Sequence, residues 1–121
     1  MLLQEMFYKI REYHEKLGYN YTGMSLEQQM EAIRHNGLAL HQEVAELIDS
    51  FPWKPWRDAH KQRWDNENAT EEIVDILFFL GNIMEAVGID PEDLELMFEV
   101  KLKENYDRIE RGYNNKPEER R

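Results

Sequence analysis

The segment EEIVDILFFLGNIMEAV, residues 71–87, decides the fold expected for this chain of 121 residues. Its apolar side chains recur at helical spacing and cover most of the circumference of a helix, with Thr70 as the expected N-cap and Gly88 as the stop. A helix that is apolar on nearly every side has to be covered on nearly every side. We therefore expect this segment to be the central helix of an all-α domain.

Three other segments have the helical period and their own boundary signals. The spacing of Ser25 and Gln28 is that of a capping box, and Asp90 followed by Pro91 is typical of a helix start. The three expected helices are residues 2–17, residues 26–50 and residues 91–111. Since no stretch alternates convincingly with period two, the sequence predicts a four-helix bundle without strands.

The length suits one domain, which we expect to span residues 1–113, followed by a polar C-terminal tail at residues 114–121. The segment 71–87 is more apolar than a lone bundle of this size can fully cover. We therefore expect oligomerisation through helix faces, as a homodimer or a homotetramer.

The overall composition excludes several functional classes. Lys and Arg number 15 against 25 Asp and Glu, and the net charge of -10 opposes binding to nucleic acid, which needs a basic face. The chain has no cysteine, which excludes zinc thiolate sites and cysteine nucleophiles. The most apolar run, residues 73–84, is too short to span a membrane and contains Asp75. We expect a soluble, cytoplasmic protein that binds neither nucleic acid nor membranes.

Two pairs of acids are embedded in the apolar sides of their helices. Glu43 and Glu46 form the motif E-V-A-E, and Glu72 and Asp75 form the motif E-I-V-D. The members of each pair are three residues apart, so their side chains share a helix face. Because the chain has 25 acids, solvated acids at the edge of the core are the alternative for either pair alone.

The combination of the two pairs predicts a metal site. If the two helices pack side by side, four carboxylates converge, and without compensation they repel one another and lose hydration. A divalent cation removes this conflict. Because all four ligands are oxygens, we expect Mg²⁺, with Mn²⁺ as a substitute.

An acidic metal site with an open side needs an anion to complete it, and phosphate oxygens are the usual choice for Mg²⁺. Lys101, Asn105 and Arg108 step by four and then three residues, so they share one helix face. They offer a point charge, an amide donor and a guanidinium fork to a phosphate chain. The alternative is a solvated basic helix end that the helix dipole favours.

The loop W-K-P-W contains residues that suit the rest of a nucleotide. Trp53 and Trp56 are large enough to stack on a nucleobase or a ribose, and Lys54 suits a phosphate. The prolines around them restrict the loop to few conformations, as a binding wall requires. The alternative is that the two tryptophans close one end of the core.

These motifs, in this order, resemble the signature of the all-α nucleoside triphosphate pyrophosphohydrolases, a superfamily that includes MazG-like enzymes and dimeric dUTPases. The stretch E-V-A-E-L-I-D-S-F-P-W-K-P-W is similar to the dimeric dUTPase branch. The resemblance continues through E-E-I-V-D-I-L-F-F-L and K-L-K-E-N-Y-D-R-I-E-R-G-Y and covers roughly residues 38–113. The compact length is nearer to the minimal MazG-like core and suits a phage-encoded enzyme in a host cytoplasm.

The resemblance implies roles for the motif residues. The implied magnesium ligands are Glu43, Glu46, Glu72 and Asp75. The implied phosphate-binding residues are Lys54, Lys101, Asn105 and Arg108, with Tyr113 closing the site. The implied reaction converts a nucleoside triphosphate and water to a monophosphate and pyrophosphate. In that reaction Glu43 or Glu46 orients or deprotonates the attacking water.

The resemblance and the residues leave more than one function open. Phe78 stands where a dUTPase is expected to have a polar residue, so the same chemistry on dCTP, on dGTP or GTP, or on modified deoxynucleotides is the alternative to dUTP. A non-enzymatic alternative is a helical module that binds a protein through Trp53 and Trp56. A helical nucleic-acid regulator is opposed by the net charge of -10.

Overall fold

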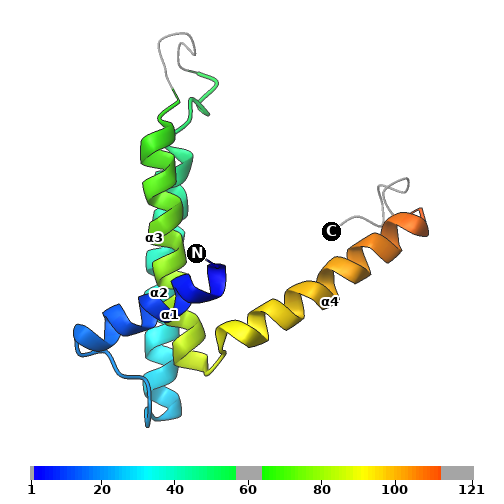
Figure 1. Ribbon diagram of the computed structural model, residues 1–121. Coiled ribbons are helices and arrows are strands. Elements are labelled where there is room, and N and C mark those ends of the chain that lie inside the picture. The colour runs from blue at the N-terminus through cyan, green and yellow to red at the C-terminus, as the bar shows by residue number, and fades with distance from the viewer. Residues whose placement is uncertain (1, 57–63, 113–121) are drawn as a thin grey trace. The chain divides into compact units, whose positions relative to one another are not determined.

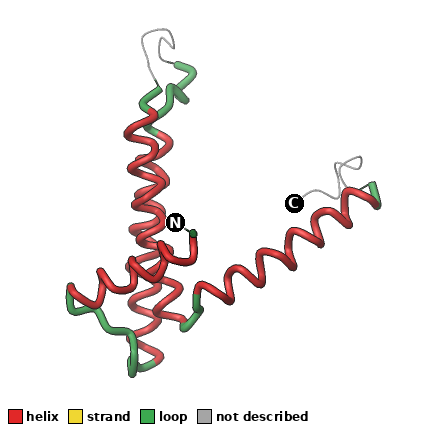
Figure 2. The backbone as a smooth tube through the Cα atoms, in the orientation of Figure 1, coloured by secondary structure: helices red, strands yellow, loops and turns green. Residues whose placement is uncertain are grey.

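The computed structural model describes residues 2–56 and 64–112 (Figures 1 and 2). These residues form four helices and no strand, which confirms the expected all-α bundle class. The helices are α1 (Leu3–Lys16), α2 (Leu26–Ile48), α3 (Asn66–Val87) and α4 (Pro91–Glu110). In the part of the chain that the structure describes, no helix is both long and apolar enough to cross a membrane. The expected tail at residues 114–121 lies outside the described residues.

The chain divides into two compact units, residues 1–89 and residues 90–121. In the first unit, α3 packs along α2 and is crossed by α1 (Figure 1). The segment with the most apolar sequence therefore contacts both other helices of its unit, as predicted from residues 71–87. The second unit contains α4.

The core of the first unit lies where α1 meets α3. Phe7 and Ile10 of α1 and Met84 of α3 are buried there. The partly buried side chains that pack against them are Leu77, Phe78 and Leu80. This contact fixes how α1 lies on α3, and it therefore helps to shape any site that the two helices share.

A glycine permits the close approach of α1 to α3. A methyl group on Gly81 would lie 2.9 Å from Ile10 Cγ2 and 3.4 Å from Phe7 Cδ1. The first distance is too short for two carbon atoms, and the methyl group of a β-branched isoleucine cannot swing away freely. Gly81 is therefore needed at this contact, although a glycine inside a helix costs about 1 kcal/mol relative to alanine.

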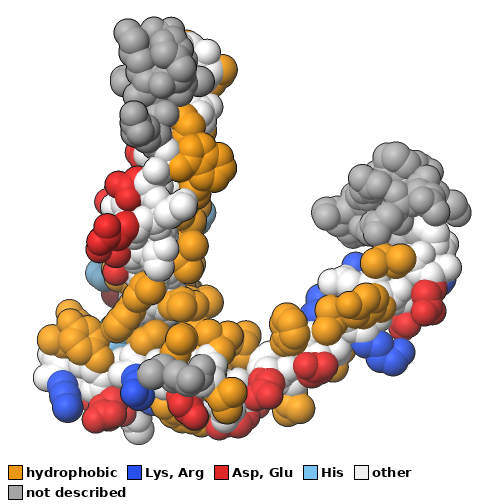
Figure 3. Space-filling view, turned by 45° about the horizontal axis from the view of Figure 1, so that its top comes forward, with side chains coloured by type: hydrophobic (Ala, Val, Ile, Leu, Met, Phe, Trp, Pro, Cys, Tyr) orange, Lys and Arg blue, Asp and Glu red, His pale blue; other side chains and the backbone are white. Residues whose placement is uncertain are grey.

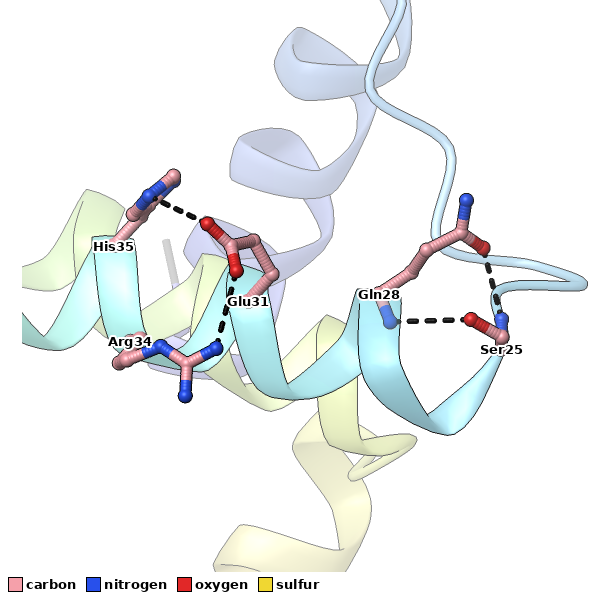
Figure 4. Close-up of polar contacts among 5 residues, drawn as sticks. All are labelled: Ser25, Gln28, Glu31, Arg34 and His35. Carbon is pink, nitrogen blue, oxygen red and sulfur yellow. Dashed lines mark hydrogen bonds and ion pairs between the residues drawn. The ribbon is translucent and has the colours of Figure 1, made fainter.

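Two predicted helix boundaries are present as expected. Ser25 Oγ accepts a hydrogen bond from the Gln28 N–H at 3.1 Å, and Gln28 Oε1 accepts one from the Ser25 N–H at 2.9 Å (Figure 4). This capping box begins α2. Gly88 ends α3 with a φ of 79°, a left-handed conformation that favours glycine.

The start of α3 differs from the prediction. The helix begins at Asn66, and Asp65 caps it by accepting a hydrogen bond from the Asn68 N–H at 2.9 Å. Thr70 is not the N-cap, because its hydroxyl donates to the Asn66 carbonyl at 2.7 Å inside the helix. The additional turn consists mainly of polar residues, so apolar periodicity does not reveal it.

The second unit begins as the sequence predicts. Pro91 occupies the first position of α4, and Asp93 Oδ2 accepts a hydrogen bond from the Asp90 N–H at 3.0 Å. Apolar side chains recur along the length of the helix (Figure 3). Charged residues lie between them along α4, and large apolar side chains such as Leu96, Phe98 and Tyr106 are exposed.

Replacing Gly81 by alanine tests the close helix contact. Gly37, in α2, is the matched control, since no neighbouring atom lies within 4 Å of a methyl group added there. Both substitutions replace a helical glycine by alanine and raise helix propensity equally. The difference between their free energies of unfolding therefore reports overpacking against Ile10. We expect Gly81→Ala to unfold in urea with a free energy about 1–3 kcal/mol lower than that of Gly37→Ala. Equal free energies would contradict the role of Gly81.

Candidate functional site

The packed pair of α2 and α3 brings three acids close together. One carboxylate oxygen from each of Glu43, Glu46 and Glu72 lies within 4.8 Å of the others. Glu43 and Glu46 come from neighbouring turns of α2, and Glu72 comes from α3. Figure 3 shows acidic side chains gathered on one side of this helix pair. Acids from the two sequence motifs therefore meet between two helices.

Two of these carboxylates have a buried oxygen without a partner. Glu43 Oε2 and Glu72 Oε2 accept no hydrogen bond from the described residues. Sharing a proton with Glu72 raises the pKa of Glu43 to about 8, and burial and the negative charge of Glu46 act in the same direction. The three side chains therefore cannot all ionise near neutral pH unless positive charge is added. The arrangement favours uptake of a proton or a cation.

The donor set fits a hard divalent cation. Every clustered donor is a carboxylate oxygen, and none of the described histidines joins the group. Carboxylate oxygens are the ligands that Mg²⁺ and Mn²⁺ prefer over nitrogen or sulfur. The partnerless oxygens of Glu43 and Glu72 would gain a partner from such an ion.

Asp75, the fourth acid of the two motifs, lies outside this group of three. Its exposed side chain lines a pocket of about 820 Å³ formed by α1, α2, α3 and the loop after α1. Asp75 is about one helical turn from Glu72 along α3, so the pocket adjoins the carboxylate cluster. The part of Asp75 in metal binding stays a prediction.

Aromatic rings form much of the pocket wall. Tyr13 comes from α1, Tyr19 from the loop after it, and Phe78 and Phe79 from α3. The ring of Phe78 meets the rings of Tyr13 and His14 edge-on, with centroid distances of 5.7 Å and 6.2 Å. The side chains that α2 contributes include Gln28, Glu31 and His35 (Figure 4). Apolar walls with a few polar groups are typical of a small-molecule site.

A short chain of hydrogen bonds lies at the same pocket. The hydroxyl of Tyr21 donates to Asn82 Oδ1 at 3.1 Å, and Asn82 Nδ2 donates to Asn36 Oδ1 at 2.8 Å. Tyr21 and Asn82 are buried, whereas Asn36 is half-buried. His14 is buried nearby, and burial lowers the pKa of its imidazole from the ordinary value for histidine, which favours the neutral form. The hydrogen-bonded chain therefore adds neutral polar groups to a pocket whose wall also contains the acids Glu31 and Asp75.

Neither Asn36 nor Asn82 was predicted from the sequence, although a signal for one of them was present. Asn82 is the one amide in the apolar run of residues 73–84. A polar side chain on a buried helix face requires partners. Such a residue is expected to bond either to another part of the protein or to a ligand. Asn82 bonds to Tyr21 and Asn36 of the protein.

A family model described as dUTPase matches residues 3–84, more than half of the chain. The chain belongs to the dUTPase family. The matched region contains α1, α2 and most of α3, and therefore the three clustered acids and the pocket. This match confirms the resemblance drawn from the acidic motifs. No curated protein and no solved structure matched the chain.

In this dUTPase-family chain the residues of W-K-P-W lie together after α2. Trp53 Nε1 donates to Asp49 Oδ1 at 3.1 Å, and the rings of Trp53 and Trp56 meet at a centroid distance of 5.7 Å. Lys54 Nζ lies 5.6 Å from the centre of the Trp53 ring. Trp56 is exposed. A part for these residues in nucleotide binding stays a prediction.

The basic residues of the final motif lie in the second unit. Lys101, Asn105 and Arg108 belong to α4, and Lys101 Nζ lies 3.3 Å from Glu104 Oε2 on the same helix. The match to the dUTPase family ends before α4. Phosphate binding by these three residues therefore stays a prediction. Tyr113, which was expected to close the site, lies outside the described residues.

The raised pKa of Glu43 predicts how the stability of the metal-free protein changes with pH. The folded chain holds this proton more tightly than the unfolded chain, so its contribution is fully present below pH 4.5 and is lost as the pH rises to about 8. Glu43→Gln cannot ionise and should lose less stability over this range. Urea unfolding in the presence of a chelator measures both proteins. If the free energy of unfolding depended on pH in the same way in wild type and in Glu43→Gln, the three acids would not interact.

Proposed function

We propose that this chain is a Mg²⁺-dependent pyrophosphohydrolase that converts dUTP and water to dUMP and pyrophosphate. The observation that carries the proposal is the cluster of Glu43, Glu46 and Glu72, whose oxygens lie within 4.8 Å of one another beside an aromatic pocket. Membership of the dUTPase family supports a nucleotide substrate and a hydrolytic reaction.

The clustered acids would hold the metal ion. Glu43, Glu46 and Glu72 supply oxygen ligands, and Asp75 is the fourth acid assigned to this role. Mg²⁺ suits such ligands and usually combines a few carboxylates with substrate phosphates, and Mn²⁺ is expected to substitute. When bound, the ion offsets the negative charge of the triphosphate and makes water a stronger acid.

Glu46 or Glu43 would orient the attacking water and accept its proton. The water oxygen bonds to the α-phosphorus while the bond from that phosphorus to the bridging oxygen breaks, so pyrophosphate leaves and dUMP remains. No covalent intermediate with the protein is needed.

The pocket would hold the nucleobase and the cluster would hold the phosphates. Asp75 lines the pocket and is about one turn from Glu72 on α3, so a nucleotide can extend from one to the other. Trp53 and Trp56 would stack on the base or ribose. Lys54 would bind a phosphate as a point charge.

The basic face of α4 would bind the phosphate chain. Lys101, Asn105 and Arg108 are spaced so that their side chains share one side of the helix. The positive charges of Lys101 and Arg108 would offset charge that develops on the leaving pyrophosphate, and the Asn105 amide would donate a neutral hydrogen bond. Tyr113 would close the site.

A homodimer or homotetramer is proposed as the active form. Ile73 and Val74 on α3 are 50% and 44% exposed, and Val44 and Ile48 on α2 are 40% and 44% exposed. These four apolar side chains lie on the two helices that carry the acids. A group of exposed apolar residues on packed helices is typical of a surface that another subunit covers.

A second candidate function keeps the reaction and changes the base. Phe78 contributes an apolar ring to the pocket where a dUTPase is expected to have a polar residue, and the pocket volume of about 820 Å³ leaves room for a larger base. The alternative substrates are dCTP, dGTP or GTP, and modified deoxynucleotides.

Substitution of single carboxylates tests the assignment of the cluster. We expect Glu46→Gln and Glu72→Gln each to lower dUTP hydrolysis more than about 100-fold, because even groups that only orient a metal ligand contribute 10–100-fold. Glu71→Gln is the matched control, since Glu71 is an exposed neighbour of Glu72 and lies outside the cluster. Initial rates with saturating Mg²⁺ measure the effect. Rates in the two cluster variants that equal the Glu71→Gln rate would exclude this active site.

A nucleotide panel tests the reaction and the base together. We expect Mg²⁺-dependent release of monophosphate and pyrophosphate, with dUTP hydrolysed faster than dCTP, dGTP and GTP. Chromatography that separates dUMP from dUDP identifies which phosphorus is attacked. Release of dUDP and phosphate would contradict attack at the α-phosphorus, and a faster rate with another nucleotide would favour the second candidate function.

A further inference from the structure

Two side-chain hydrogen bonds bridge the helix pair of α2 and α3. Asn68 Nδ2 of α3 donates to Ser50 Oγ at 2.7 Å, and Ser50 lies in the turn that follows α2. Asn82 Nδ2 of α3 donates to Asn36 Oδ1 of α2 at 2.8 Å. The two bridges therefore fix how α3 lies along α2 at two separate levels.

The bridge between Ser50 and Asn68 lies one helical turn from the clustered acids. Ser50 comes four residues after Glu46 in the chain, and Asn68 comes four residues before Glu72. Because α2 and α3 run in opposite directions (Figure 1), the same step along both helices leads from the two acids to the bridge. The hydrogen bond and the acids are therefore neighbouring layers of one helix contact.

The bridge between Asn36 and Asn82 has the same register. Asn36 comes ten residues before Glu46, and Asn82 comes ten residues after Glu72. One alignment of the two helices therefore satisfies both bridges, and that alignment places Glu46 beside Glu72. The carboxylates lie between the two bridges along the helix pair. A slip of one helix against the other would break both bonds.

Ser50 is the buried member of the bridge nearer to the acids. It is 4% exposed, and its backbone carbonyl accepts a hydrogen bond from the Asp65 N–H at 3.0 Å. Asp65 is the N-cap of α3. The Ser50 hydroxyl donates a long hydrogen bond of 3.5 Å to the Glu46 carbonyl near the end of α2. Ser50 therefore connects the backbone that carries Glu46 to the start of the helix that carries Glu72.

A polar bridge in a buried helix contact has a cost that an apolar pair does not have. Ser50 is buried and Asn68 is half-buried, so both lose water that their hydrogen bond has to replace. A polar residue in the seam of a coiled coil has the same cost, and it selects one register of the helices. A fixed register is needed here, because the acids Glu43, Glu46 and Glu72 repel one another across the contact.

We propose that Ser50 and Asn68 are positioning residues, which hold the acids of α2 and α3 at the separation that a metal ion requires; this rests on the proposed function. An ion that takes ligands from two helices needs their oxygens placed to within about 0.5 Å. The acids alone cannot supply that order in the metal-free protein, since their charges push the helices apart. The bridge one turn away supplies it before the ion binds.

Substitution of Ser50 by alanine tests the positioning role. Ser50→Ala removes the acceptor of the bridge and changes none of the three acids. We expect it to weaken Mn²⁺ binding to the nucleotide-free protein by about 10-fold, the lower end of the range for groups that orient metal ligands. Calorimetry measures the dissociation constants. Thr70→Val is the matched control, because the Thr70 hydroxyl donates to the Asn66 carbonyl within α3. Equal dissociation constants in Ser50→Ala and Thr70→Val would overturn the proposal.

A second control separates loss of position from a general loss of stability. Ile10→Val shortens a core side chain that contacts α3 near Gly81, about 13 Å along the helix from Glu72. Such a change destabilises a protein about as much as the loss of one hydrogen bond. We expect Ile10→Val to unfold at a lower urea concentration than wild type and to bind Mn²⁺ with unchanged affinity. Equal weakening of Mn²⁺ binding in Ile10→Val and Ser50→Ala would overturn the positioning role.

A measurement on wild type keeps the test valid if Ser50→Ala fails to fold. If the bridge strengthens metal binding, a bound metal ion strengthens the bridge by the same factor, because linkage is reciprocal. The Asp65 N–H, which bonds to the Ser50 carbonyl at the same junction, should therefore exchange its hydrogen more slowly when Mg²⁺ is added. The Thr22 N–H bonds to Asn20 Oδ1 in its own loop and should exchange at an unchanged rate. An Asp65 exchange rate that saturating Mg²⁺ does not change would overturn the proposal.

The same samples separate this proposal from the proposed function. Wild type that binds no Mn²⁺ would contradict both. Wild type that binds Mn²⁺, together with Ser50→Ala of equal affinity, would overturn the positioning role alone. Hydrolysis of dUTP is measured in parallel, and metal binding that depends on Ser50 without hydrolysis would contradict the enzyme and leave the positioning role standing.

Discussion

Three carboxylates held within 4.8 Å of one another repel, and a proton or a cation is needed to relieve that repulsion. Glu43 and Glu72 each keep a buried oxygen without a hydrogen bond, so the helix pair bears an electrostatic cost. A protein that needed only a stable contact between α2 and α3 would place apolar residues there. Acids in that position support the proposal that this contact binds a metal ion.

The central position of α3 connects this cluster to the pocket. Glu72, Asp75, Phe78 and Asn82 follow one another at helical spacing, so one side of α3 passes from the carboxylates to the aromatic wall and the amides. The rise from Glu72 to Asn82 is about 15 Å. The tight packing of α1 at Gly81 holds the opposite wall of the pocket in place. The charged end and the aromatic end of the proposed site therefore lie along one side of α3.

Much of this arrangement follows from patterns that are local in the sequence. The helical period, the capping box at Ser25 and the stop at Gly88 identify helices because they depend on neighbouring residues. The acids at positions 43, 46 and 72 are also recognisable, because their spacing within each helix fixes the face they occupy. The sequence alone did not show that α3 starts at Asn66, since a polar first turn has no apolar period. Nor did it show the pocket amides, because Asn36 and Asn82 are 46 residues apart and meet only through tertiary packing.

Anomalous diffraction from crystals grown with Mn²⁺ tests the central claim most directly, because it locates the ion without any assumption about the reaction. The structure predicts an anomalous peak bonded to oxygens of Glu43, Glu46 and Glu72, and loss of that peak in Glu72→Gln. A map with no peak among these three carboxylates, or with the carboxylates turned away from one another, would contradict the account.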